Sequence, residues 1–241
     1  MPNRLLILCI GLSVALSACG GGKNPAVPSS GSGTTASQTS VATKEQLEER
    51  ANAGDANAQF ELGAVYHDGE VGPKDFALAK QWFEKAAKQG EIRSQFNLGV
   101  MYYQGEGVPQ NYAKAKDWFG KAATQGNARA QFNLGVMNYR GEGMSKNFAK
   151  AIDLFNKAAA QNFAEAQFNL GVMYALGEGV TADGLQAYAW FTLAKAGGNT
   201  RAAEAITSLE EQMTPEQIKQ ARDMAVTLGA QLEAAARKVI Q

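Results

Sequence analysis

Residues 130–143 read AQFNLGVMNYRGEG, and close copies of this stretch occur three more times in the 241-residue chain. The copies are SQFNLGVMYYQGEG at 94–107, AQFNLGVMYALGEG at 166–179 and AQFELGAVYHDGE at 58–70. Their central glycines are Gly63, Gly99, Gly135 and Gly171, each 36 residues from the next. Self-similarity at a fixed period is typical of repeat proteins, in which each unit packs against its neighbours.

Each unit begins with the pattern of a helix that ends in a glycine turn. In the third unit, Phe132, Gly135 and Val136 share one face of a first helix over residues 130–139. A Gly-Glu-Gly turn follows in most units. We expect this turn to end the helix, because glycine accepts the left-handed conformation of a helix C-terminus.

A second helix completes each unit. It begins near Asn111 or Asn147 and runs for about 15 residues, and Ala115, Phe119 and Ala122 form its apolar stripe. Left-handed residues should end these second helices, and asparagine is the usual substitute for glycine there. The residues in these positions are Gly90, Gly126, Asn162 and Gly198.

The two ends of the array depart from the repeat. Residues 44–54 align with the end of a second helix, which predicts an N-terminal half-unit. In the fourth unit Gly184 stands where the other units have an aromatic residue, and residues 200–212 resemble a first helix without its glycine. Thr214-Pro215-Glu216-Gln217 then supplies the start of a closing helix over 215–239. Its expected apolar contacts with the last repeat are Ile218, Ala221, Ala225, Leu228 and Leu232.

These patterns predict an all-α chain, an α/α solenoid of about four 36-residue helix-turn-helix repeats with a C-terminal capping helix. The predicted solenoid domain covers residues 43–241, with repeats at about 55–90, 91–126, 127–162 and 163–198 and a cap at 199–241. The unit A-x-F-x-L-G-x-x-Y-x-x-G-x-G-V…A-x-x-W-F-x-x-A-A-x-x-G resembles the Sel-1-like repeat (SLR), a relative of the tetratricopeptide repeat. The resemblance implies a protein-binding scaffold or adaptor, often in bacterial envelopes.

The N-terminus has the pattern of a lipoprotein signal. Leu5–Leu16 is an apolar run of twelve residues, too short for a membrane-spanning helix of about 20 residues and typical of a signal-peptide core. Leu16-Ser17-Ala18-Cys19 resembles the bacterial lipobox. That resemblance implies a lipoprotein signal peptide at 1–18, cleavage before Cys19 and lipidation of the Cys19 thiol. An ordinary secretory signal and a membrane anchor are the alternatives.

The segment after the lipidation site predicts where the domain is held. Residues 19–42 are expected to form a lipidated cysteine followed by a disordered tether, because Gly, Ser, Thr and Pro predominate there. Gly20 stands where retention in the inner membrane commonly uses Asp. By resemblance, this favours an outer-membrane lipoprotein of the cell envelope that faces the periplasm, with exposure on the cell surface as an open alternative.

Composition argues against several functional classes. Lys plus Arg and Asp plus Glu are 23 each, so the chain lacks the net positive charge of a nucleic-acid-binding protein. Two cysteines and one histidine cannot supply a four-ligand zinc site, and no catalytic constellation is recognisable. We therefore predict no cofactor, no metal and no enzyme activity. The recurring turn residues Glu70, Glu106, Glu142 and Glu178 favour turn or inter-repeat hydrogen bonds.

Positions that vary while their neighbours repeat are the candidate partner contacts. In tetratricopeptide repeats the first helices line the concave surface, and by that resemblance the ends of these helices face a groove. Their variation suggests that packing does not dictate them, although simple solvent exposure is the alternative. The predicted contacts are His67, Asp68, Tyr103, Gln104, Tyr139, Arg140 and Leu176.

The sequence thus predicts a non-enzymatic envelope lipoprotein that binds a protein or peptide through the concave face of its repeats. Its predicted membrane contact is the lipid on Cys19, and association with peptidoglycan is a further option. The alternatives are an envelope enzyme or inhibitor that acts on peptidoglycan, and a purely structural spacer.

The lipoprotein assignment makes a direct prediction. Radiolabelled palmitate should enter the wild-type protein, which should fractionate with the outer membrane, because two or three acyl chains anchor stably. Cys19→Ala should yield an unprocessed or soluble periplasmic form. Absence of label from the wild-type chain would contradict the assignment.

Overall fold

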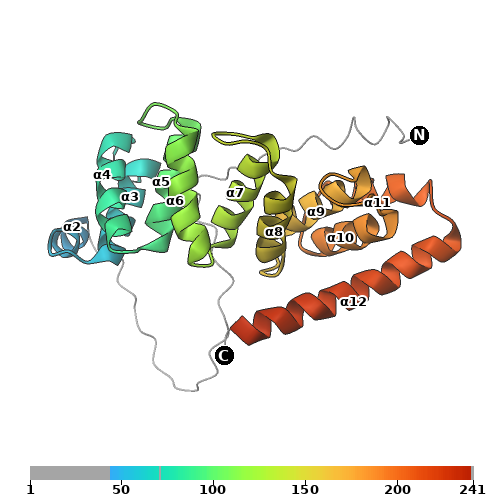
Figure 1. Cartoon of the computed structure of the whole chain (residues 1–241). Coiled ribbons are helices and arrows are strands. Elements are labelled where there is room, and N and C mark those ends of the chain that lie inside the picture. Colours follow the sequence, from blue (N-terminus) through green and yellow to red (C-terminus); the bar gives the residue numbers. More distant parts are fainter. Residues whose placement is uncertain (1–43, 71, 240–241) are drawn as a thin grey trace, which may run out of the picture. The chain divides into compact units, whose positions relative to one another are not determined.

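The computed structural model describes residues 44–70 and 72–239, and the predicted signal peptide, Cys19 and tether lie outside this range. The described residues fall into two compact units, 44–111 and 112–239. Within the described residues there are eleven helices and no strands (Figure 1). The predicted all-α fold class of consecutive helix pairs, an α/α solenoid, is confirmed.

The first compact unit contains four helices. They are α2 (Lys44–Asn52), α3 (Ala56–Asp68), α4 (Phe76–Lys88) and α5 (Ile92–Gln104). Helix α2 is the predicted N-terminal half-unit, and it covers one side of α3. Leu47 and Ala51 of α2 form a buried cluster with Ala58 and Leu62 of α3.

The second compact unit contains seven helices. They are α6 (Tyr112–Thr124), α7 (Ala128–Arg140), α8 (Phe148–Ala159), α9 (Ala164–Leu176), α10 (Gly184–Ala196), α11 (Ala202–Glu210) and α12 (Pro215–Val239). The second helices of the repeats are 12 or 13 residues long, shorter than the expected 15. Helix α4 ends early because its last turn is tighter than an α-helical turn. The Gln89 N–H donates to the carbonyl of Ala86, only three residues back.

Left-handed residues end the helices as the sequence predicts. Each first helix stops at a glycine with φ between 73° and 79°, and its N–H donates to a carbonyl four residues back. The second helices are followed by left-handed residues as well. After α8 this residue is Asn162, with φ of 59°, and it is the only non-glycine residue with positive φ among the described residues. The sequence-based assignment of Asn162 to a glycine position is confirmed.

A close approach between glycine and phenylalanine holds the two helices of a repeat together. A Cβ placed on Gly135 of α7 would lie 2.7 Å from Phe155 of α8, and Gly63 and Gly171 meet Phe83 and Phe191 in the same way. All three phenylalanine rings are fully buried. The repeated glycine therefore provides the space that an aromatic ring of the same repeat fills.

A buried glutamine joins each first helix to the second helix before it. The side-chain Nε2 donates to a backbone carbonyl near the end of the preceding helix, at 3.0–3.3 Å. The four pairs are Gln59 with Ala51, Gln95 with Ala87, Gln131 with Ala123 and Gln167 with Ala159. Each bond gives a second donor to a carbonyl that already accepts the backbone N–H of the left-handed residue three positions on.

A ring near the end of a first helix is bonded to the turn of the next repeat. His67 Nε2 lies 3.3 Å from Glu106 Oε2, and its Nδ1 lies 2.7 Å from Asp68 Oδ1. The hydroxyl of Tyr139 donates to Glu178 in a short hydrogen bond, and its ring packs edge-on against Phe148. We call these two contacts latches. They confirm the expectation that turn glutamates such as Glu106 and Glu178 make inter-repeat hydrogen bonds.

Helix α12 closes the array as the sequence predicts. Thr214 and Gln217 form the capping box, with Thr214 N–H donating to Gln217 Oε1 at 2.9 Å and Gln217 N–H donating to Thr214 Oγ1 at 3.2 Å. Figure 1 shows α12 as a long helix that runs alongside α10. Ala221 and Ala225 are buried, and Leu228 and Leu232 pack against the cluster that contains Trp190.

The glycine-phenylalanine contact predicts opposite results for two helical glycines. Gly135→Ala should reduce the free energy of unfolding by about 1–3 kcal/mol, because the new methyl group overlaps the Phe155 ring. Gly120→Ala in α6 is the matched control, since its Cβ would meet no atom within 4 Å. It should stabilise the protein by about 0.5–1 kcal/mol through helix propensity. Equal effects in urea titrations would contradict the packing explanation.

The Tyr139 latch predicts a second, pH-dependent effect. Tyr139→Phe should cost about 1–2 kcal/mol, because a hydrogen bond to a carboxylate is lost. Tyr174→Phe is the control, since the structure shows no hydrogen bond for the Tyr174 hydroxyl, and it should change stability little.

The pH dependence follows from the pKa of Tyr139. Burial, and then the bond to Glu178, raise this pKa above its ordinary value of 10.0, so the unfolded chain loses this proton at lower pH than the folded chain. The stability from Tyr139 is therefore complete below pH 10 and is lost as pH rises through the folded pKa. The difference in stability between wild type and Tyr139→Phe should narrow above pH 10, and a constant difference would contradict the latch.

Candidate functional site

The structure places the predicted partner contacts in two groups. His67 and Tyr103 are 4% and 8% exposed, and Tyr139 is engaged in its latch. The premise that packing does not dictate this column is therefore wrong for His67 and Tyr139. Ala175 completes the column, and the residue 39 positions after it is Thr214, not a glutamate. The column varies because a histidine and a tyrosine can both form the latch. Ala175 forms none, since the last repeat is not followed by another glycine turn.

The other predicted contacts lie at the ends of the first helices and are at least partly exposed. Asp68 holds the His67 ring, and Arg140 lies 3.5 Å from Glu142. With its side-chain amide oriented so that the nitrogen faces Glu106, Gln104 donates to the Glu106 carboxylate at 3.1 Å. Leu176 is 36% exposed, unusual for a leucine in this protein. Asp68, Gln104, Arg140 and Leu176 are thus accessible to a partner, and their role in binding stays a prediction.

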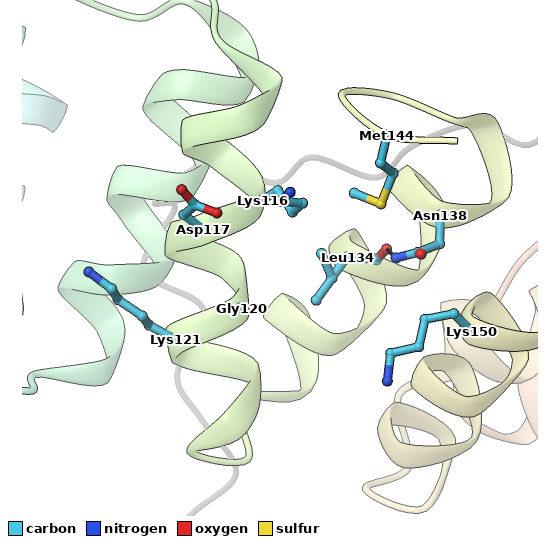
Figure 2. Close-up of a pocket in the computed structure, with 8 residues that line it drawn as sticks. All are labelled: Lys116, Asp117, Gly120, Lys121, Leu134, Asn138, Met144 and Lys150. Atoms are coloured by element: carbon cyan, nitrogen blue, oxygen red, sulfur yellow. Dashed lines mark hydrogen bonds between the residues drawn. The ribbon is translucent and has the colours of Figure 1, made fainter. Parts of the chain in front are cut away.

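A pocket of about 570 Å³ lies between α6, α7 and α8, at a place that sequence reasoning did not single out. Figure 2 shows Leu134 and Asn138 on α7, with Met144 of the following turn above them. The lining residues are Lys116, Asp117, Gly120, Lys121, Leu134, Asn138, Met144 and Lys150. All of them belong to the compact unit 112–239.

Two residues that differ from the repeat pattern open this pocket. The leucine of the repeat is fully buried as Leu62, Leu98 and Leu170, but Leu134 is partly exposed. Asn138 stands where the other units have tyrosine, and its Nδ2 turns back to donate to the Leu134 carbonyl at 2.7 Å. Gly120 presents no side chain, where the first two equivalent positions carry glutamate. The third repeat therefore leaves its leucine uncovered.

The charge around the pocket is predominantly positive. Lys116, Lys121 and Lys150 line it together with a single acidic side chain, Asp117. Lys150 also lies 3.2 Å from Asp153, and Lys121 lies over the Trp118 ring at 4.0 Å. Figure 2 shows the Lys121 ammonium pointing away from Leu134, so Lys116 supplies the positive charge beside the apolar side chains, which suits a ligand that is both apolar and anionic.

The lining of the pocket does not fit a metal ion, since Asp117 is its only acidic side chain and it contains no His or Cys. Across residues 44–70 and 72–239 no three His, Cys, Asp or Glu side chains cluster as metal ligands would. No helix in the same ranges is long and apolar enough to cross a membrane. The signal for the pocket is present in the sequence, because Gly120 and Asn138 depart from the residues at the equivalent positions of other repeats. The predicted contacts came instead from columns that vary among the repeats.

Comparisons with known proteins assign the family. The Sel1 repeat matches residues 56–91, 92–127, 128–163 and 164–199. The crystal structure of a Sel1 repeat protein from Oxalobacter formigenes is 29% identical with a TM-score of 0.65, and the match covers 76% of this chain and 78% of that one.

A second solved structure is similar over most of this chain. It is a protective antigen present in uropathogenic Escherichia coli strains, which displays an SLR fold. The identity is 30% and the TM-score 0.54, and the match covers 80% of this chain and 49% of the antigen, so the chain spans about half its length. No curated protein matches the chain. Sel1 repeats commonly serve as protein-protein interaction scaffolds, and with four consecutive copies this chain belongs to the Sel1 repeat family.

Proposed function

We propose that this protein is a non-enzymatic interaction scaffold of the cell envelope. Lipid on Cys19 anchors it to the outer membrane, residues 20–42 give the repeats reach, and the repeats bind a protein partner in the periplasm. The lipobox-like sequence at 16–19 supports the anchor, and membership in the Sel1 repeat family supports the scaffold. Association with peptidoglycan belongs to the same proposal as a second contact.

The observation that carries the proposal is the open pocket of the third repeat. A spacer would gain stability by closing it, because a glycine inside a helix costs about 1 kcal/mol relative to alanine. Covering Leu134 with a tyrosine would bury further apolar surface. Local departures that reduce stability without a structural benefit are typical of functional sites. The pocket is therefore a candidate place for a partner to contact the repeats.

The accessible residues at the ends of the first helices form the rest of the proposed contact set. Arg140 and Leu176 combine a directional donor with exposed apolar surface, and arginine is frequent at binding hot spots. Asp68 and Gln104 are smaller contributors in this proposal. His67 and Tyr139 act mainly by holding repeats together, and Tyr103, which is largely buried, is a smaller contributor.

A crosslinking experiment in intact cells tests the proposal. The affinity-tagged full-length protein is crosslinked in living cells, and captured proteins are identified in parallel from cells that carry Cys19→Ala. A partner of the envelope should be captured by the wild type and depleted with Cys19→Ala. It should then bind the purified full-length chain in a saturable manner.

Variants locate the contact once a partner is isolated. Arg140→Ala should weaken binding by more than about 1 kcal/mol with unchanged circular dichroism, whereas Lys219→Ala on the exposed side of α12 should have no effect. Release of labelled fragments from peptidoglycan by the purified protein would instead support the enzyme alternative. Failure of every captured protein to bind the purified chain would contradict the scaffold proposal.

A further inference from the structure

The first repeat shows how the space equivalent to the pocket is normally filled. The ring of Tyr66 packs in the cluster that contains the buried Leu62, and its hydroxyl donates to Glu48 at 3.3 Å. Lys44 lies over the same ring at 5.5 Å and pairs with Glu48 at 3.6 Å. A lysine, a glutamate and a tyrosine thus cover the leucine together.

The leucine of the second repeat is covered by the same three residue types, with the lysine and the glutamate on the preceding helix α4. Lys80 pairs with Glu84 at 2.8 Å, and the hydrogen bond with Glu84 is the main reason that the pKa of Lys80 is raised. The equivalent tyrosine, Tyr102, is 8% exposed, and Leu98 beneath it is fully buried. Two independent repeats therefore define one arrangement, which we call the Lys-Glu-Tyr cover.

The leucine of the third repeat keeps only part of this cover, whose lysine and glutamate positions lie on the preceding helix α6. Lys116 occupies the lysine position and Leu134 the leucine position, but Gly120 replaces the glutamate and Asn138 the tyrosine. Figure 2 shows Lys116 reaching from α6 toward α7, where Leu134 lies. A Cβ on Gly120 would meet no atom within 4 Å, so the carboxylate position is also open. What is absent is one aromatic ring and one carboxylate.

We propose that the pocket binds a peptide segment of a partner protein that supplies these missing groups, an aromatic side chain next to an acidic one. This inference rests on the proposed scaffold function and specifies the chemistry of the partner. The aromatic ring lies on Leu134 and Met144, beneath Lys116, as Tyr66 lies on Leu62 beneath Lys44. The carboxylate pairs with Lys116, as Glu48 and Glu84 pair with their lysines.

Charge and size both favour this occupant. Lys116 carries positive charge from α6 toward Leu134, so a neighbouring carboxylate on the partner is attracted. A lysine above an aromatic face adds a favourable cation-π contact. A volume of about 570 Å³ accommodates an aromatic side chain and the backbone on either side of it.

The N-terminal segment of this chain cannot supply the missing groups. Residues 1–43 contain no Phe, Tyr or Trp and no Asp or Glu, and residues 240–241 are Ile and Gln. The same holds for these segments in a second copy of the chain. These segments are therefore excluded as the occupant, which favours a segment of a different protein.

Three synthetic peptides test the inference. The probe is Gly-Ser-Glu-Tyr-Glu-Gly-Ser with capped ends, and its two controls replace the tyrosine by alanine or both glutamates by glutamine. Titration into the full-length protein is followed by NMR, using the amide signals of Gly120, Leu134 and Asn138. The probe should shift these signals saturably. The alanine peptide should bind at least tenfold more weakly, and the glutamine peptide at least threefold.

A variant that restores the Lys-Glu-Tyr cover is the decisive control. Gly120→Glu with Asn138→Tyr should weaken probe binding at least tenfold and leave the melting temperature equal or higher, because the chain then fills its own pocket. Asn156→Glu adds the same charge at the equivalent exposed position of α8 and should leave binding unchanged. Should the double variant not fold, Lys116→Ala and Gly120→Glu singly should each weaken binding at least threefold.

The possible outcomes separate this inference from the scaffold proposal. Equal binding of the tyrosine and alanine peptides would reveal simple charge attraction to lysines and would overturn the inference. So would absence of probe binding, or full binding to the restored-cover variant. A natural partner captured equally by the wild type and that variant would leave the scaffold proposal standing and overturn the pocket assignment. Probe binding without any natural partner would contradict the scaffold proposal alone.

Discussion

A 36-residue helix pair cannot bury its own apolar surface, and the rest of this structure follows from that constraint. Each repeat must be fastened to its neighbours at fixed points. The buried glutamine ties a first helix to the preceding second helix, and the latch of His67 or Tyr139 ties it to the turn of the next repeat. The glycine turn itself packs on the preceding repeat, since a Cβ on Gly143 would lie 2.7 Å from Tyr112.

The last repeat shows what happens when a neighbour is missing. Ala175 has no latch because no fifth turn follows, and Gly184 meets no turn glycine of a next repeat. Gln167 Oε1 is buried without a partner in the described structure, because Gly197 stands where Gln161 donates to Gln131 one repeat earlier. Helix α12 compensates by covering the exposed end. Tyr188, Glu210 and Arg222 join three helices there through hydrogen bonds of 2.8–3.2 Å.

Periodicity made most of the fold predictable, and the same periodicity hid the site. Helix pairs, left-handed Asn162 and the capping box at Thr214 follow from local rules that depend only on nearby residues. The roles of His67 and Tyr139 could not be read in this way, because their partners lie 39 residues away. A variable column suggested a binding surface, whereas a histidine and a tyrosine perform the same hydrogen-bonding task. The pocket depends on two residues in different helices, so neither substitution alone indicates it.

The position of the pocket within the array is the strongest argument for its function. Departures at the ends of a repeat array have a structural cause, since a neighbour is absent there and the contacts to it have no purpose. Gly120 and Asn138 lie inside the array, where α6 packs on α7 and α8 packs on α9. Neighbours are present on both sides, and the leucine beneath is still in place to be covered. An incomplete cover at an interior position is therefore not an end effect, and a partner that supplies the missing ring and carboxylate gives it a physical reason.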